Sequence, residues 1–217
     1  MTEKSRRFKR PTTKEKLDLL EVRGFWKAIA KSRRVAETHT KVTLETVKEI
    51  HGLIFSEAIP EIAGRFRKDG EDIKELECAV PPPGRVVTEK MYEFWREFDR
   101  RLSLIRQANH VPENSTQTWL DEVFDLSAWT QYQITLIHPF CNGNGRMGRI
   151  MTNIVLIWFG LPPSPIKIES EDKDGYLRSL CQIDKYEDYE PLKKVILRGA
   201  LQTLEKEERA RRNAIRG

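Results

Sequence analysis

A histidine, two arginines and a glycine-rich turn lie within the twelve residues "HPFCNGNGRMGR", from His138 to Arg149. The intrinsic pKa of an imidazole is close to neutral pH, so His138 can accept a proton from a hydroxyl group. Arg146 and Arg149 are three residues apart, which places them on neighbouring positions of a helix, and their forked donors suit phosphate oxygens. This combination indicates phosphoryl or nucleotidyl transfer, because such reactions depend on positioning and on neutralising charge on phosphate oxygens.

The stretches on both sides of this motif have the apolar spacing of helices. Leu126, Trp129, Tyr132 and Leu136 precede it, and Met147, Ile150, Ile154 and Ile157 follow. The motif is therefore predicted to contain the end of one helix, a tight loop and the first turn of the next. Unpaired N–H groups of such a first turn attract anions, and Gly143 and Gly145 let the backbone approach a ligand closely. We expect Phe140 to bury its ring and anchor the loop.

The rest of the chain predicts one helical domain with charged ends. Thr12 and Glu15 form a capping-box pattern at the start of a first helix. Further helical spacing covers residues 42–59 and 88–105, and an irregular segment with three consecutive prolines lies between them. The predicted organisation is a basic tail over residues 1–11, a single domain over residues 12–205 and a charged tail over residues 206–217.

Composition excludes several classes of protein. The 38 basic and 33 acidic residues give a net charge of only +5, and no aromatic-interleaved basic stripe or zinc-ligand spacing predicts nucleic-acid binding. The longest apolar run, Ile154–Phe159, is far shorter than the roughly 18 residues that a membrane span requires. Cys78, Cys141 and Cys181 have no metal-like spacing, and no signal segment opens the sequence. These features predict a reduced, cytoplasmic protein.

The central motif resembles the signature of the Fic family, His-Pro-Phe-x-Asp/Glu-Gly-Asn-Gly-Arg-x-x-Arg, and departs from it only at Asn142. Upstream, "IHGLIFSEAIPEIAGRFR" is similar to the family's helix and Gly-x-Tyr/Phe-Arg segment, and downstream "YEDYEPLKKVI" is similar to its helix after the motif. The resemblance covers residues 40–200. It implies an all-α fold, a Fic-like helical bundle with a short β-hairpin flap within residues 67–86.

The resemblance also implies an activity, the transfer of AMP from ATP to a hydroxyl side chain of a target protein. His138 would be the general base, and Arg146 and Arg149 would hold the outer phosphates. The loop implied to bind the α- and β-phosphates consists of Gly143, Asn144 and Gly145. The flap in residues 67–86 would clamp the backbone of the target protein by strand addition.

Asn142 stands where the family has an acidic metal ligand. An amide oxygen brings no negative charge, and Mg²⁺ prefers carboxylate and phosphate oxygens, so weak binding of Mg²⁺ by the protein is expected. Three alternatives stay open: AMP transfer with Mg²⁺ held mainly by ATP, transfer of another phosphate-containing group, and a catalytically weak adaptor that binds nucleotide or peptide. A fourth, Cys141 as a nucleophile next to His138, lacks an orienting third residue.

Many members of this family are inhibited by a helix with the pattern Ser/Thr-x-x-x-Glu-Gly/Asn. Two Thr-x-x-x-Glu matches, which begin at Thr118 and Thr203, are followed by Val123 and Glu208 in place of Gly or Asn. Both matches fit ordinary solvated helix faces. Inhibition by a small antitoxin-like partner, self-inhibition and no inhibition therefore remain alternatives.

Overall fold

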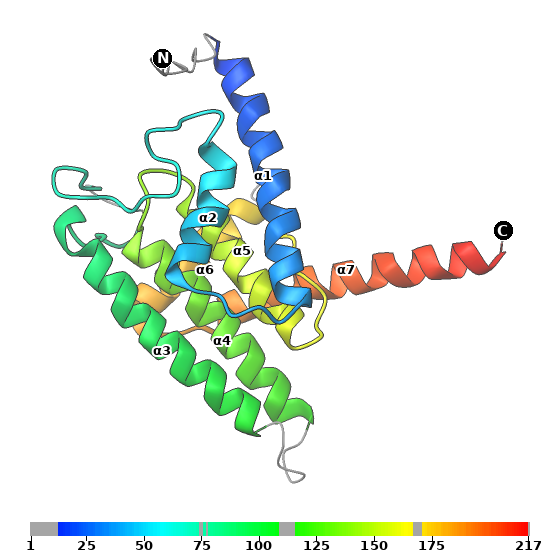
Figure 1. Cartoon of the computed structure of the whole chain (residues 1–217). Helices are drawn as coiled ribbons and strands as arrows, with labels where there is room; N and C mark the ends of the chain where they lie inside the picture. The colour runs from blue at the N-terminus through cyan, green and yellow to red at the C-terminus, as the bar shows by residue number, and fades with distance from the viewer. Residues whose placement is uncertain (1–12, 74–75, 77, 109–115, 167–170, 217) are drawn as a thin grey trace.

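The computed structural model describes residues 13–73, 76, 78–108, 116–166 and 171–216 (Figure 1). These residues form an all-α fold, as predicted. The helices are α1 (Lys14–Glu37), α2 (Leu44–Phe55), the short 3-10 helix η1 (Gly84–Val86), α3 (Val87–Ala108), α4 (Thr116–Ile137), α5 (Asn144–Trp158), α6 (Glu171–Tyr186) and α7 (Glu190–Arg216).

The expected β-hairpin flap is not seen, because no strand occurs in the described part of the chain. Residues 74, 75 and 77 of the flap segment lie outside the described residues. The rest of the segment from Arg67 to Pro83 has irregular backbone that is tied down locally, for example by a hydrogen bond from the Leu76 N–H to the Ala79 carbonyl at 2.9 Å. Proline and glycine in this segment oppose regular strand pairing, which explains the difference.

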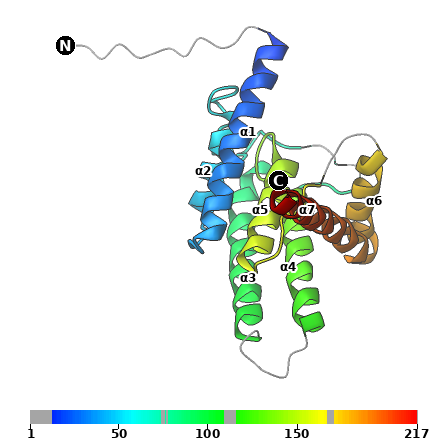
Figure 2. The ribbon, with the colours of Figure 1, turned by 90° about the vertical axis from the view of Figure 1, so that its right-hand side faces the viewer.

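Helix α5 lies at the centre of the bundle, packed against α4 and α1, and α3 runs alongside α4 (Figures 1 and 2). The buried positions of α5 recur at helical spacing: Met147, Ile150, Met151, Ile154 and Val155 are all at most 1% exposed. Burial of this face holds the helix in place, because each large aliphatic side chain removed from water contributes about 1.5–3 kcal/mol. The position of the motif is thereby fixed relative to α4.

The first helix begins one residue later than predicted. Thr13, not Thr12, is the N-cap of α1, and its hydroxyl accepts a hydrogen bond from the Lys16 N–H at 3.4 Å. The predicted capping box of Thr12 with Glu15 is therefore wrong, because Thr13 supplies the side-chain cap of this helix. A capping box is formed instead at α2, between Thr43 and Thr46.

The predicted charged tail at the C-terminal end is helical. The predicted charged tail from residue 206 continues α7, whose second half projects away from the bundle (Figures 1 and 2). Its side chains over residues 206–215 are exposed. The predicted basic tail of residues 1–11 lies outside the described residues. Among the helices that the structure describes, none combines the length and apolarity needed to cross a bilayer.

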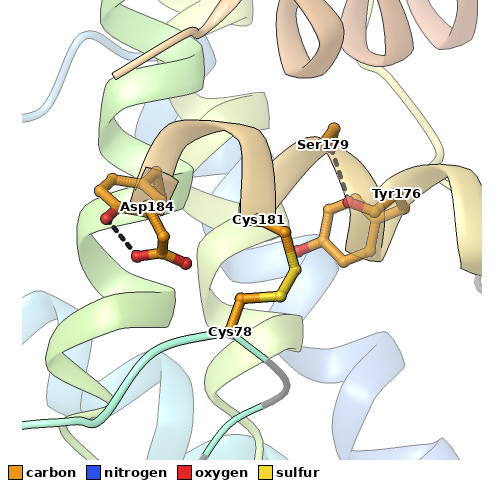
Figure 3. The surroundings of a disulfide bond; sticks show 6 residues. Cys78, Tyr176, Ser179, Cys181 and Asp184 are labelled. Atoms are coloured by element: carbon orange, nitrogen blue, oxygen red, sulfur yellow. Dashed lines mark hydrogen bonds between the residues drawn. A yellow bond between two sulfur atoms is a disulfide. The ribbon is translucent and has the colours of Figure 1, made fainter. Parts of the chain in front are cut away.

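Two of the three cysteines form a disulfide. Cys78, in the segment before α3, is bonded to Cys181 on α6 with a Cα–Cα distance of 5.3 Å (Figure 3). The prediction of a fully reduced protein is therefore wrong for this pair, while Cys141 is free. The sequence contained no short-range signal for this bond, because the two cysteines are 103 residues apart and only the packing of α6 brings them together.

Candidate active site

His138 follows the last residue of α4 and has a left-handed backbone conformation, with φ of 49°. Its ring Nδ1 lies 3.2 Å from the carbonyl oxygen of Thr135. Because a carbonyl only accepts hydrogen bonds, Nδ1 carries the proton and Nε2 retains a lone pair. Burial lowers the pKa of His138; the hydrogen bond to Thr135 opposes this shift, and the positive charge of Arg67 adds to it. The ring is thus held as a neutral base near pH 7.

A cavity of about 350 Å³ lies beside this base, a size that suits a small-molecule ligand. Its walls come from α4, α5, α6 and the segment before α3. The lining residues are Leu76, Cys78, Ala79, Tyr132, Thr135, Leu136, His138, Gly145, Arg149, Tyr176, Leu177, Leu180, Cys181 and Asp184. Three residues predicted from the motif, His138, Gly145 and Arg149, therefore share one cavity.

The first turn of α5 reaches this cavity at Gly145, while Gly143 and Asn144 are not part of the lining. Gly143 is its N-cap with φ of 81°, and a Cβ atom there would come within 2.7 Å of the Phe55 ring, so this position requires glycine. The N–H groups of the first turn, at Asn144, Gly145 and Arg146, have no intrahelical acceptor. The helix dipole adds positive potential at the same place, which makes this turn suitable for an anion.

The side chain of Asn144 closes the loop and is not available to a phosphate. It is 2% exposed. Its Oδ1 accepts a hydrogen bond from the Phe140 N–H at 2.8 Å, and its Nδ2 donates to the Phe140 carbonyl at 2.7 Å. Phe140 is fully buried, and its ring stacks on His51 with centroids 3.7 Å apart. Only the backbone N–H of Asn144 remains for the phosphate contact that the resemblance implied.

The structure separates the two arginines that we expected at one phosphate site. Arg149 lines the cavity, and its Nη1 is buried without a hydrogen-bond partner among the described residues. Burial lowers the pKa of this guanidinium. Arg146 instead forms an ion pair with Glu21 of α1 at 2.9 Å and lies over the Phe55 ring. Arg149 is therefore the cation available inside the cavity, while Arg146 is engaged with α1.

We expect Arg149→Met to raise the free energy of unfolding by about 1 kcal/mol, because it removes a buried donor that has no partner. The same change should weaken ATP binding at least about tenfold, since a charge-assisted contact to phosphate contributes about 1.5–3 kcal/mol. Urea denaturation and calorimetric titration with ATP measure the two effects. Arg146→Met is the matched control and should lower stability by breaking the Glu21 ion pair. A less stable Arg149→Met protein with unchanged ATP affinity would show a structural role.

His51 is a site residue that the sequence analysis missed. Its Nδ1 accepts a hydrogen bond from the Gly64 N–H, and its Nε2 donates to the Asn142 carbonyl, each at 3.0 Å. Both ring nitrogens are therefore used while the ring is neutral. Burial lowers the pKa of His51 to about 4. A polar residue among the apolar positions Val47, Ile50 and Ile54 of one helix face was the available signal.

This shift predicts an acid-sensitive fold. The pKa of His51 falls from 6.5 in the unfolded chain to about 4 in the folded one, so its stabilising contribution is complete above pH 6.5 and is lost as the pH falls through 4. Over that window the loss amounts to about 3 kcal/mol. Chemical denaturation between pH 7.5 and 4 should show this slope in the wild type and a flatter one in His51→Gln. Equal pH dependence of stability in the two proteins would contradict the assignment of this acid sensitivity to His51.

Asn142 does not build a metal site with its neighbours. Its side chain is exposed, and its Oδ1 accepts a hydrogen bond from the Gly143 N–H at 2.7 Å. In the described ranges, no group of three or more His, Cys, Asp or Glu side chains is placed to hold a metal ion. One neutral oxygen that is already hydrogen-bonded is a poor donor set for Mg²⁺, so the residues present do not fit a resident Mg²⁺ ion.

The nucleophile alternative at Cys141 gains no support. Its side chain is not part of the cavity lining, and burial together with the nearby Glu71 carboxylate raises the pKa of the thiol. A raised pKa keeps the sulfur in its unreactive thiol form. The structure therefore favours His138 as the chemically active group of the motif.

Helix α6 supplies one wall of the cavity, and the sequence analysis did not predict this helix. Tyr176, Cys181 and Asp184 face the cavity from it (Figure 3). Asp184 accepts a hydrogen bond from the Tyr132 hydroxyl of α4 at 2.6 Å, which joins α6 to α4. The signal in the sequence was the helical spacing of Tyr176, Leu180 and Ile183, all buried.

Solved structures share this fold at low sequence identity. Fic-1 from Caenorhabditis elegans superimposes with a TM-score of 0.69 at 20% identity, over 94% of this chain and 55% of that one. The BepC protein of Bartonella tribocorum, solved with bound AMPPNP, has a TM-score of 0.55 at 16% identity, over 86% of this chain and 87% of that one.

Sequence comparison gives the family. A Fido domain-containing protein of Dictyostelium discoideum is 47% identical over 64 residues, 29% of this chain and 43% of that protein. The protein adenylyltransferase Fic of Nematostella vectensis is 27% identical over 164 residues, 76% of this chain but 34% of that protein, so the chain spans about a third of its length. The model of the Fic/DOC family matches residues 41–156, more than half of the sequence, and contains the whole motif. The chain therefore belongs to the Fic/DOC family.

Proposed function

We propose that the chain is a protein adenylyltransferase that transfers AMP from ATP to a hydroxyl side chain of a target protein. The observation that carries this proposal is the state of His138, a residue of the cavity lining whose Nδ1–H is fixed by Thr135, which leaves Nε2 as the base. The N-terminal turn of α5 and Arg149 supply positive charge to the same cavity. Relatives named as adenylyltransferases and a structural neighbour with a bound ATP analogue support the proposal.

The reaction follows from these positions. His138 Nε2 accepts the proton of the target hydroxyl while the hydroxyl oxygen forms a bond to the α-phosphorus of ATP. The bond from the α-phosphorus to the oxygen that bridges to the β-phosphate breaks, and pyrophosphate leaves. Backbone N–H groups of the α5 first turn and the Arg149 guanidinium neutralise charge on the phosphate oxygens. Burial keeps His138 neutral, so it is ready to accept the proton at pH 7.

We propose that Mg²⁺ arrives with the nucleotide as part of the substrate, since Asn142 contributes no charge. Asn142→Asp should then lower the Mg²⁺ concentration for half-maximal AMP transfer, because a carboxylate is the oxygen ligand that Mg²⁺ favours. The measurement is a Mg²⁺ titration of protein labelling for the two proteins side by side. An equal or weaker metal response of the variant would favour transfer of another phosphate-containing group.

The target protein is proposed to bind beside the segment from Arg67 to Val86. Leu76, Cys78 and Ala79 of this segment line the cavity, so a chain that lies along it places a hydroxyl side chain near His138. Binding through backbone contacts would position the acceptor with little demand on its sequence.

The experiment that tests the function is a comparison of two labels. In a cell lysate, α-labelled ATP should label more protein with the wild type than with His138→Asn. Labelling from γ-labelled ATP should be equal for the two, because the γ-phosphate leaves in pyrophosphate and only the kinases of the lysate transfer it to protein. A gain of label from γ-labelled ATP alone indicates phosphoryl transfer instead. Peptide or ATP binding without any transfer would favour the adaptor alternative.

A further inference from the structure

Arg67 is buried more completely than any other charged side chain in the described residues, with 1% of its surface exposed. Within the described part of the chain, its guanidinium makes hydrogen bonds to backbone carbonyls alone. Nε donates to His138 at 2.6 Å, Nη2 donates to Ile137 at 3.2 Å and to Pro82 at 2.8 Å, and Nη1 donates to Glu71 at 3.1 Å. One side chain thus joins the end of α4 to two points of the segment before α3.

These contacts bear directly on the turn that carries His138. The last carbonyls of a helix have no intrahelical donor, and Arg67 supplies donors to the Ile137 carbonyl, the last of α4, and to the His138 carbonyl that follows it. Its own backbone N–H donates to the Pro139 carbonyl at 2.7 Å. The left-handed conformation of His138 is therefore held by three hydrogen bonds from a single residue, at a position where a non-glycine residue is otherwise disfavoured.

We propose that Arg67 is a positioning residue for the transfer reaction: it fixes the turn at His138 so that the imidazole keeps Nδ1–H on Thr135 and presents Nε2 to the cavity. The inference rests on the proposed function of His138 as the base. Arg67 does not line the cavity, so it does not contact the nucleotide. Its loss should consequently change the rate of the chemical step without changing ATP binding.

The charge of Arg67 supports the same role. It lowers the pKa of His138 in addition to the larger effect of burial. The other titratable or charged groups that share the cavity with His138 are Tyr132 of α4, Arg149 of α5, and Tyr176 and Asp184 of α6. Tyr132 donates a hydrogen bond to Asp184. Arg149 is the cation among these cavity residues, and Arg67 is the cation whose charge acts on His138 from outside the cavity lining.

The decisive comparison uses Arg67→Lys and Arg67→Met in the full chain. Nitrogen NMR of the His138 ring, assigned by its absence in His138→Asn, reports tautomer and pKa without any need for activity. We expect the wild type to show the Nδ1–H tautomer and both variants to show a mixture of the two tautomers. The pKa of the His138 ring should be higher in Arg67→Met than in the wild type.

The kinetic test is a labelling assay with the same two variants. Relative to the wild type, kcat of Arg67→Met should fall about 10- to 100-fold while KM for ATP stays within about twofold. The acid limb of the kcat profile should move to higher pH in Arg67→Met, and Arg67→Lys should recover part of the rate.

Arg65→Met is the matched control. Arg65 lies two residues away and pairs with Glu71 at 2.7 Å but makes no contact with His138, so its loss should leave tautomer and kcat unchanged. Three results would overturn the proposal: an unchanged His138 tautomer in folded Arg67→Lys, a KM for ATP that changes in step with kcat, or an Arg67→Lys protein that does not fold. If the wild type transfers no AMP, the proposed function fails, and the NMR result alone decides the role of Arg67.

Discussion

Replacement of His138 by asparagine should lower AMP transfer by about 10²–10⁴-fold, the usual contribution of a positioned general base. Asparagine suits this test because it tolerates a left-handed backbone, and His138 has φ of 49°. The variant thus removes the base with little strain in the turn. The measurement is incorporation of label from α-labelled ATP into protein, with His138→Asn and the wild type compared at equal concentration.

Two controls separate chemistry from folding. His138→Gly relieves backbone strain and should be as inactive as His138→Asn, whereas His138→Ala retains strain of about 1 kcal/mol at positive φ. ATP affinity should stay within about threefold of the wild type in His138→Asn, because α5 and Arg149 make the proposed phosphate contacts. Undiminished labelling by a folded His138→Asn protein would remove His138 from the mechanism.

Reduction of the Cys78–Cys181 disulfide should lower the free energy of unfolding by about 3–4 kcal/mol, because this bond closes a loop of roughly one hundred residues in the unfolded chain. Urea titrations with and without dithiothreitol measure the loss, and Cys78→Ser should reproduce it without reductant. Cys141→Ser is the control, since Cys141 is free and its replacement should leave the response to dithiothreitol intact.

The same bond joins two walls of the cavity, the segment at Cys78 and helix α6 (Figure 3). Reduction should therefore weaken ATP binding as well as lower stability. If the purified protein contains three titratable thiols without reductant, the disulfide is absent in solution. An unchanged urea midpoint on addition of dithiothreitol would lead to the same conclusion.

The sequence by itself determined the local features of this protein. Apolar residues at helical spacing predicted α1 to α5, and burial at the same spacing holds these helices in the bundle. The order of His138, Gly143, Gly145 and Arg149 indicated a base and an anion site, and three of these four residues line one cavity. Such features are readable because each depends on residues within one or two turns of each other.

Only the tertiary structure decided which side chains face the cavity and which hold the loop. Arg146 and Arg149 have the same local pattern, yet the packing of α1 pairs Arg146 with Glu21 and leaves Arg149 in the cavity. The contacts of His51 with Asn142 and of Arg67 with His138 span 91 and 71 residues, and the disulfide spans 103. No periodicity encodes such contacts, because they arise when buried faces of distant helices pack together and the polar groups trapped between them must find partners.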